Sequence, residues 1–122
     1  MARVLALVPD LLFGSRVQGS LLAAGHEVEL IGDEAALRGR LEDAAQRPVA
    51  VLVVDLTNED LDGASIVESL AGGGLLAQIR TLGFYSHVDA PARARAEQAG
   101  FDLVVPRSRM AREGAQLLER LS

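Results

Sequence analysis

Two acidic residues, Asp10 and Asp55, each follow a short apolar run, at the point where a strand would end and a loop begin. Two carboxylates brought together can bind a divalent cation, and Mg²⁺ often takes only one or two protein carboxylates while keeping several of its waters. Each residue also has a simpler interpretation, because Asp frequently caps a turn or the first turn of a helix. The two residues could therefore form a site only if the fold places both of them at the same edge of a sheet.

Further polar side chains follow two later apolar runs. Tyr85, Ser86 and His87 stand at the end of one run, and Arg107 stands just after another. His87 beside Asp89 could act as a general base or a metal ligand, but one His with a nearby acid gives few converging ligands, so a solvated loop position is favoured. The planar guanidinium of Arg107 suits an anion, although Arg here also fits a solvated rim. These residues are candidates for phosphate or anion contact.

The elements that must position these residues alternate along the chain. The apolar runs that fit strands are residues 4–8, 27–31, 49–54, 79–85 and 103–105. The stretches that fit helices are residues 14–24, 34–45, 64–71, 91–99 and 110–121. Strict alternation predicts parallel strands joined by right-handed crossovers, with helices on both faces of the sheet. We expect an α/β fold: a three-layer αβα sandwich whose five-stranded parallel sheet has the flavodoxin-like order 2-1-3-4-5, as a single domain over residues 1–122.

In that order the first and third strands are neighbours, so Asp10 and Asp55 are expected at one edge, outside the carboxyl ends of the strands. Residues 49–54 are continuously apolar, as in a central strand buried on both sides. Asp33 is expected to cap the second helix, and Ser108 or Arg109 is expected to precede the last. Other core residues are expected at Leu5, Leu7, Val17, Leu21, Leu70, Leu117 and Leu118. The glycine run at 72–74 precedes a strand, so it is expected to be a loop rather than a phosphate cradle.

Composition excludes several classes of function. The 122 residues carry a net charge of -5 with only 3% aromatic side chains, which disfavours binding to nucleic acid. No stretch approaches the roughly 20 apolar residues of a membrane helix, and no export signal is recognisable, so a cytoplasmic protein is expected. There is no Cys, and all 12 basic residues are Arg, so thiolate and lysine chemistry are absent.

Three segments together resemble the receiver domain of response regulators, the CheY-like family. Residues 55–63, DLTNEDLDG, follow a strand as the receiver phosphoacceptor Asp does, with Gly eight residues later. Residues 85–89, YSHVD, resemble the end of receiver strand four, and residues 97–102, EQAGFD, resemble the stretch before strand five. The resemblance extends over essentially the whole chain. It implies phosphorelay signal transduction, with Asp55 as phosphoacceptor and Asp10 as one of two metal-binding acids.

The other receiver positions depart from that pattern. The second acid after strand one is replaced by Pro9, which has no ligand atom in its side chain. The receiver Thr or Ser after strand four falls on Tyr85, with Ser86 one place later. The receiver Lys falls on Arg107, or on Val105 if the following prolines are aligned. We expect Arg107 to reach Asp55 and neutralise the pocket by a charge-assisted pair.

These departures weaken phosphoryl transfer, which depends on positioning and on cancelling charge by a metal ion and a cation. The favoured hypothesis is therefore a non-enzymatic pseudo-receiver, a signalling or scaffolding module that acts through protein–protein contacts. One alternative is an atypical single-domain response regulator that a histidine kinase phosphorylates on Asp55. A further alternative is a small-anion binder or an unknown enzyme that uses the same edge. Mg²⁺, held weakly by Asp10 and Asp55, is the one cofactor suggested, and the partners, a homodimer among them, stay open.

Overall fold

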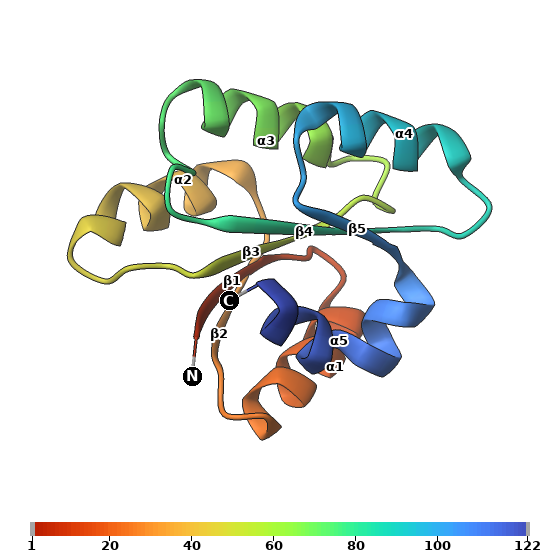
Figure 1. Ribbon diagram of the computed structural model, residues 1–122, viewed down its shortest axis with the longest axis horizontal. Helices are drawn as coiled ribbons and strands as arrows, with labels where there is room; N and C mark the ends of the chain where they lie inside the picture. Colours follow the sequence, from red (N-terminus) through yellow and green to blue (C-terminus); the bar gives the residue numbers. More distant parts are fainter. Residues whose placement is uncertain (1, 122) are drawn as a thin grey trace.

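In the computed structural model, which describes residues 2–121, five strands alternate with five α-helices (Figure 1). The strands are β1 Arg3–Leu7, β2 Glu27–Ile31, β3 Val51–Asp55, β4 Arg80–Tyr85 and β5 Leu103–Pro106. The helices are α1 Leu11–Ala23, α2 Glu34–Glu42, α3 Gly63–Gly72, α4 Ala90–Ala99 and α5 Arg107–Leu121, and the short 3₁₀ helix η1 spans Asp43–Ala45. All strand pairs are parallel, in the order β2-β1-β3-β4-β5. The predicted fold class and strand order are confirmed.

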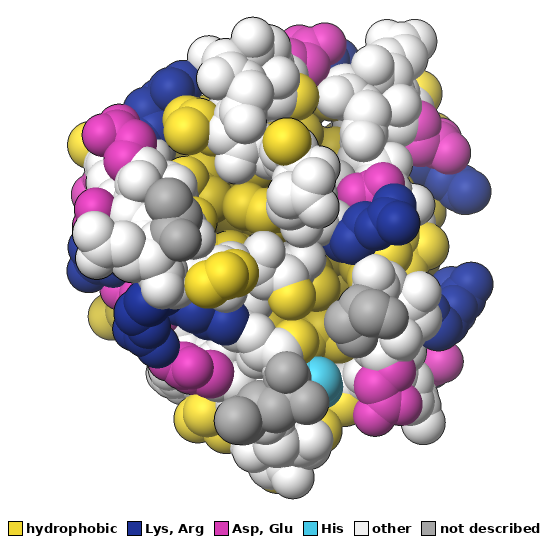
Figure 2. Space-filling view, turned by 60° about the vertical axis from the view of Figure 1, so that its left-hand side comes forward, with side chains coloured by type: hydrophobic (Ala, Val, Ile, Leu, Met, Phe, Trp, Pro, Cys, Tyr) yellow, Lys and Arg dark blue, Asp and Glu magenta, His cyan; other side chains and the backbone are white. Residues whose placement is uncertain are grey.

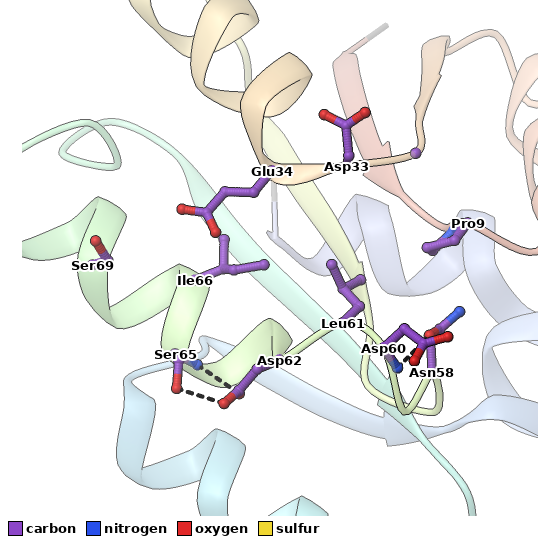
Figure 3. Close-up of a pocket in the computed structure, with 11 residues that line it drawn as sticks. Pro9, Asp33, Glu34, Asn58, Asp60, Leu61, Asp62, Ser65, Ile66 and Ser69 are labelled. Carbon is purple, nitrogen blue, oxygen red and sulfur yellow. Dashed lines mark hydrogen bonds between the residues drawn. The ribbon is translucent and has the colours of Figure 1, made fainter.

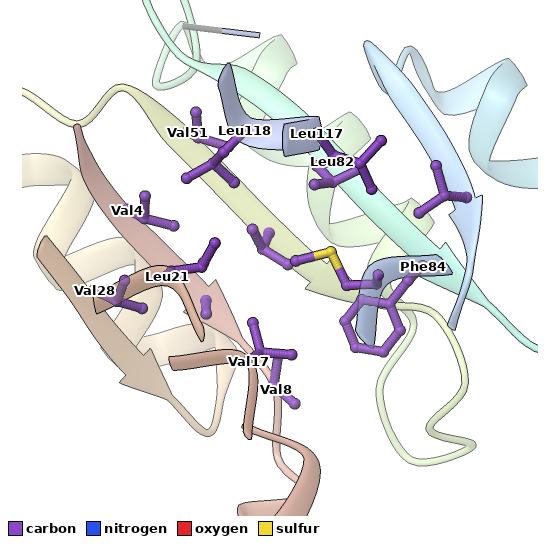
Figure 4. Packing of buried hydrophobic residues seen from close by; sticks show 14 of the residues in the cluster. Val4, Val8, Val17, Leu21, Val28, Val51, Leu82, Phe84, Leu117 and Leu118 are labelled. Carbon is purple, nitrogen blue, oxygen red and sulfur yellow. The ribbon is translucent and has the colours of Figure 1, made fainter. Parts of the chain in front are cut away.

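The helices lie in two layers on opposite faces of the sheet. Figure 1 shows α2, α3 and α4 on one face and α1 and α5 on the other. The buried residues form two clusters that match these layers, because successive side chains of a strand point to opposite faces. Val51 and Val53 join the cluster under α1 and α5 (Figure 4), whereas Leu52 and Val54 join the other. All seven further core residues expected from the sequence are buried: Leu5, Leu7, Val17, Leu21, Leu70, Leu117 and Leu118.

Aspartates begin four of the five helices. Asp10 accepts hydrogen bonds from the Leu12 and Phe13 amides at 2.9 and 3.2 Å and so caps α1. Asp33, Asp62 and Asp89 cap α2, α3 and α4 in the same way. A carboxylate at this position satisfies amides that have no partner inside the helix. The capping role expected for Asp33 is confirmed, and so is the simpler interpretation of Asp10.

Two helix starts differ from the sequence pattern. The apolar periodicity predicts that the first helix starts at residue 14, but α1 begins at Leu11 because Asp10 caps it. The last helix begins at Arg107, directly after Pro106, rather than at residue 110. Ser108 and Arg109 therefore lie inside the first turn of α5, and the expectation that one of them precedes this helix is wrong.

Ionised side chains of both signs are interspersed over the surface. On the face in Figure 2, acidic and basic groups lie beside one another around a middle region where hydrophobic side chains gather. Within residues 2–121, no helix combines the length and hydrophobicity needed to cross a membrane. The glycine run at 72–74 joins the end of α3 to the approach to β4, with Gly74 in the left-handed region at φ 77°, so it is the loop that was expected.

Candidate functional site

Asp10, Asp55 and Arg107 all stand at the carboxyl end of the sheet. Asp55 is the last residue of β3, Asp10 lies in the loop after β1, and Arg107 is the first residue after β5. The strand order makes β1 and β3 neighbours, with β4 between β3 and β5. The predicted placement at one edge is therefore observed.

Asp55 is a buried carboxylate held by its own turn. Only 2% of the residue is exposed. Its Oδ1 accepts hydrogen bonds from the Thr57 amide at 2.7 Å and from the Thr57 hydroxyl at 2.6 Å. This is the local turn that the simpler interpretation of Asp55 predicts. Both donors use the same oxygen, so Oδ2 is the oxygen that remains for any chemistry at this carboxylate.

Arg107 contacts Asp10 rather than Asp55. Its Nη2 lies 3.6 Å from Asp10 Oδ2, and its Cζ lies 4.2 Å from the centre of the Phe13 ring. Phe13 in turn packs against Phe84 of β4, with 5.0 Å between the ring centres. The guanidinium is thus held by a cation–π contact and an ion pair, both at the start of α1. The expectation that Arg107 reaches Asp55 is wrong, because α1 begins one turn early and brings Phe13 and Asp10 within its reach.

A pocket of about 660 Å³ opens at this edge beside the Arg107 side chain. Arg107, Ser86 and His87, three of the four predicted anion-contact residues, line it, whereas Tyr85 is buried at the end of β4. The remaining lining residues are Phe13, Arg16, Thr57, Ser108 and Ala111. Asp55 is not among them. His87 is exposed in the loop between β4 and α4, as expected of a solvated loop position.

The sequence places Thr57 at this edge, just after the third strand, but it identifies neither Arg16 nor Thr57 as a candidate site residue. Arg16 lies inside α1, in a stretch where a charged residue simply indicates the solvated face of a helix. Thr57 carried a usable signal, because a hydroxyl two residues after Asp suits the turn that Asp55 forms. The part of the pocket lining that lies on α1, Arg16 included, is therefore marked by no local sequence motif.

A second groove, of about 640 Å³, lies between the starts of α2 and α3 (Figure 3). Its acidic lining residues are Asp33, Glu34, Asp60 and Asp62. Asp33 and Asp62 are occupied as helix caps. The Ser65 amide and then the Ser65 hydroxyl, which both donate to Asp62, lower the pKa of its carboxyl. Local helix capping accounts for half of the acids in this groove.

The residues at the carboxyl edge fit a bound metal ion poorly. In the described part of the chain, no three His, Cys, Asp or Glu side chains are grouped closely enough to hold a cation. Asp10 uses one oxygen to cap α1 and the other to pair with Arg107. Its neighbour Pro9 contributes no side-chain ligand. A Mg²⁺ ion at Asp10 would have to compete with Arg107 for this carboxylate.

Comparisons with solved structures agree with this fold. No protein-family model matches the sequence, and no curated protein was found to be similar to it. Solved structures do match: the chemotaxis protein CheY4 of Vibrio cholerae has a TM-score of 0.81 at 20% identity, over 100% of this chain and 99% of that chain. The chain has the fold of a response-regulator receiver domain.

Two other receiver-fold structures were determined in states relevant to the site. The phosphorylated cyanobacterial phytochrome response regulator RcpA has a TM-score of 0.81 at 12% identity, over 98% of this chain and 93% of that chain. The Mn²⁺-bound form of response regulator Rcp1 has a TM-score of 0.75 at 14% identity, over 98% of this chain and 91% of that chain. The receiver resemblance inferred from the sequence is thus confirmed for the fold, and the residue roles stay predictions.

Proposed function

We propose that this chain is a non-enzymatic, receiver-like signalling or scaffolding module that acts through protein contacts without a complete phosphorylation cycle. One observation carries the proposal. Asp10 and Arg107, to which the receiver resemblance assigns the roles of a metal ligand and of the receiver lysine, pair with each other at the start of α1. Neither is engaged with Asp55, so the two groups that should cancel phosphoryl charge are occupied elsewhere.

Two further features support this proposal. The receiver resemblance aligns Pro9 with the second acid of receivers, and the chain contains no Lys that could take the role of the receiver lysine. Arg107 is also held over the Phe13 ring, a contact that a flexible ammonium would make less well. We infer that Mg²⁺ binding is weak. We also infer that the partner is a protein that recognises one fixed conformation of this domain. Such partners include a second copy of this chain.

The test is the reaction of the purified protein with acetyl phosphate and Mg²⁺, followed by intact mass. A working receiver is the positive control, and the Asp55→Asn variant defines the background. We expect no added phosphoryl mass in the native protein under conditions that modify the control. Stoichiometric modification that Asp55→Asn abolishes would overturn the proposal.

That contrary result would support the second candidate, a single-domain response regulator phosphorylated on Asp55, with a histidine kinase as its partner. Two observations support this candidate. Asp55 lies at the end of β3, and its Oδ2 is available for phosphorylation because Thr57 donates only to Oδ1. For phosphorylation to proceed, Arg107 would have to leave Asp10 so that Mg²⁺ could bind there.

A further inference from the structure

The polar side chains that residues 2–121 contribute to the pocket at the carboxyl edge all carry donor groups, and none is an acid. Two of its lining residues are arginines, Arg16 and Arg107, and a third is His87. Three hydroxyl side chains complete the polar lining: Thr57, Ser86 and Ser108. Guanidinium groups and hydroxyls are the donors that bind phosphoryl and carboxylate oxygens, and clustered arginines bind them by charge-assisted hydrogen bonds. The chemistry of the lining thus favours an anion.

Arg16 is unusual among the arginines of this acidic chain. Ten of the 12 arginines form ion pairs within residues 2–121. Arg16 and Arg120 are the two for which these residues provide no ion pair. Arg120 lies in the last turn of α5, where a cation interacts favourably with the helix dipole. Arg16 lies on the solvated face in the middle of α1, away from the favourable end of the helix dipole, and it lines the pocket.

We propose that this pocket binds a small multivalent anion with phosphoryl or carboxylate groups, without a metal ion and without a covalent bond to Asp55. Arg16 supplies a cation that has no ion pair among residues 2–121, and Arg107 and His87 supply further donors. The Ser86 and Ser108 hydroxyls complete the coordination, because the Thr57 hydroxyl already donates to Asp55. The volume of about 660 Å³ accommodates a ligand larger than inorganic phosphate. This inference goes beyond the proposed function and does not depend on it, because binding of the anion requires neither a phosphorylation cycle nor a protein partner.

Two carboxylates near the pocket limit its affinity. Asp10 competes for Arg107, at 3.6 Å, and Asp55 is buried nearby, although neither lines the pocket. The Asp10→Asn substitution removes the competing charge while keeping a side-chain oxygen for the α1 amides, since Asn caps helices as well as Asp does. If Arg107 contributes to the site, Asp10→Asn should therefore bind anions more tightly than the native protein.

The experiment is a titration with inorganic phosphate, followed by backbone amide NMR shifts in EDTA-containing buffer at constant ionic strength. We expect saturable shifts at Ser86, His87 and Ser108. Arg16→Gln should weaken binding about tenfold, the loss of one hydrogen bond to a charged group. Arg120→Gln removes the same charge far along α5 and should leave the affinity unchanged. Asp10→Asn should raise it severalfold.

The absence of saturable shifts at these amides would overturn the proposal, as would equal weakening by Arg16→Gln and Arg120→Gln, which would indicate only a general charge effect. A parallel titration with citrate distinguishes a carboxylate ligand from a phosphoryl ligand. Because inorganic phosphate is no phosphoryl donor and EDTA removes Mg²⁺, the outcome is independent of the acetyl phosphate test of the proposed function.

Discussion

At Asp55, the cost of burying a charged carboxylate is opposed by two short hydrogen bonds from Thr57. A buried carboxylate is tolerated when it is hydrogen-bonded, and here both donors belong to a residue only two positions away. The turn therefore stabilises Asp55 locally, with no contribution from Asp10 or Arg107. Its role in the fold can be separated from any role in chemistry.

We predict that Asp55→Asn preserves the fold and changes the free energy of unfolding by less than about 1 kcal/mol, or raises it. The Asn carbonyl can still accept from Thr57, and the buried charge is gone. Urea denaturation measures the effect. Thr57→Val is the matched comparison, and it should cost roughly 1–3 kcal/mol because it leaves the carboxylate with one donor fewer. A loss on Asp55→Asn larger than that of Thr57→Val would mean that the negative charge itself holds the turn.

The sequence was sufficient to place Asp10, Asp55 and Arg107 at one edge, because residue order along parallel strands fixes which residues share that edge. The sequence did not show which of these three side chains form an ion pair. The pairing of Arg107 with Asp10 depends on Phe13 in the first turn of α1. The centre of the Phe13 ring lies 4.2 Å from Arg107 Cζ. The apolar spacing left Phe13 in a loop before the helix. The earlier helix start that goes with the Asp10 cap therefore changed the predicted partner of Arg107.

At the scale of the elements, the strands were easier to predict than the helix starts. Continuous apolar runs mark buried parallel strands, and only their ends shifted: β3 begins at Val51 rather than at residue 49. The starts of α1 and α5 depend on short-range capping and on Pro106, which compete with the apolar periodicity. The end of α2 likewise tightens into η1, so the predicted helix over 34–45 is two helical segments.

The cap of α3 predicts a pH-dependent contribution to stability. Because the hydrogen bonds from Ser65 lower the pKa of Asp62 in the folded state, its stabilising effect is fully present above the unfolded pKa of about 3.9. The effect is lost as the pH falls through the lower, folded pKa. Asp62→Ala should cost about 1 kcal/mol at pH 7, and this difference should shrink as the pH falls below about 4.

Urea midpoints of the native protein and Asp62→Ala at several pH values between neutral and strongly acidic measure this contribution. Asp60→Ala is the matched control, because it removes an acid from the same loop without removing a cap. A cost of Asp62→Ala that stayed constant down to the lowest pH would show that the charge of the cap is irrelevant.

Close packing beneath β4 predicts that Gly83 tolerates no side chain. A Cβ at Gly83 would lie 2.7 Å from Leu56 Cδ1 and 3.0 Å from Phe101 Cε2. Gly83→Ala should therefore destabilise the protein by about 1–3 kcal/mol. Gly19→Ala, in α1, where a Cβ would meet nothing within 4 Å, should instead stabilise it by about 0.5–1 kcal/mol. Thermal denaturation of both variants tests the contrast, and equal effects would contradict it.

At the scale of the whole molecule, Arg107 connects the carboxyl ends of two distant strands. It is the first residue of α5, and its partners Asp10 and Phe13 lie at the start of α1, so its side chain links the segment after β5 to the segment after β1. If Arg107 has the role of the receiver lysine, as proposed above, this side chain is already paired with Asp10 before any phosphoryl group arrives. We expect the domain to keep one conformation whether or not a phosphoryl mimic is offered.

Beryllofluoride with Mg²⁺ should therefore cause no Mg²⁺-dependent shifts around Asp55 in the amide NMR spectrum of the native protein. The Pro9→Asp, Arg107→Lys double variant restores a second acid and a compact ammonium, and it removes the planar group that stacks on Phe13. It should show Mg²⁺-dependent shifts around Asp55 and should gain phosphoryl mass from acetyl phosphate. Each single substitution should have little effect, because Arg107→Lys lacks the second acid and Pro9→Asp leaves Arg107 on Asp10. A native protein that responds as fully as the double variant would mean that the Arg107–Asp10 link opens freely and does not hold the domain in one state.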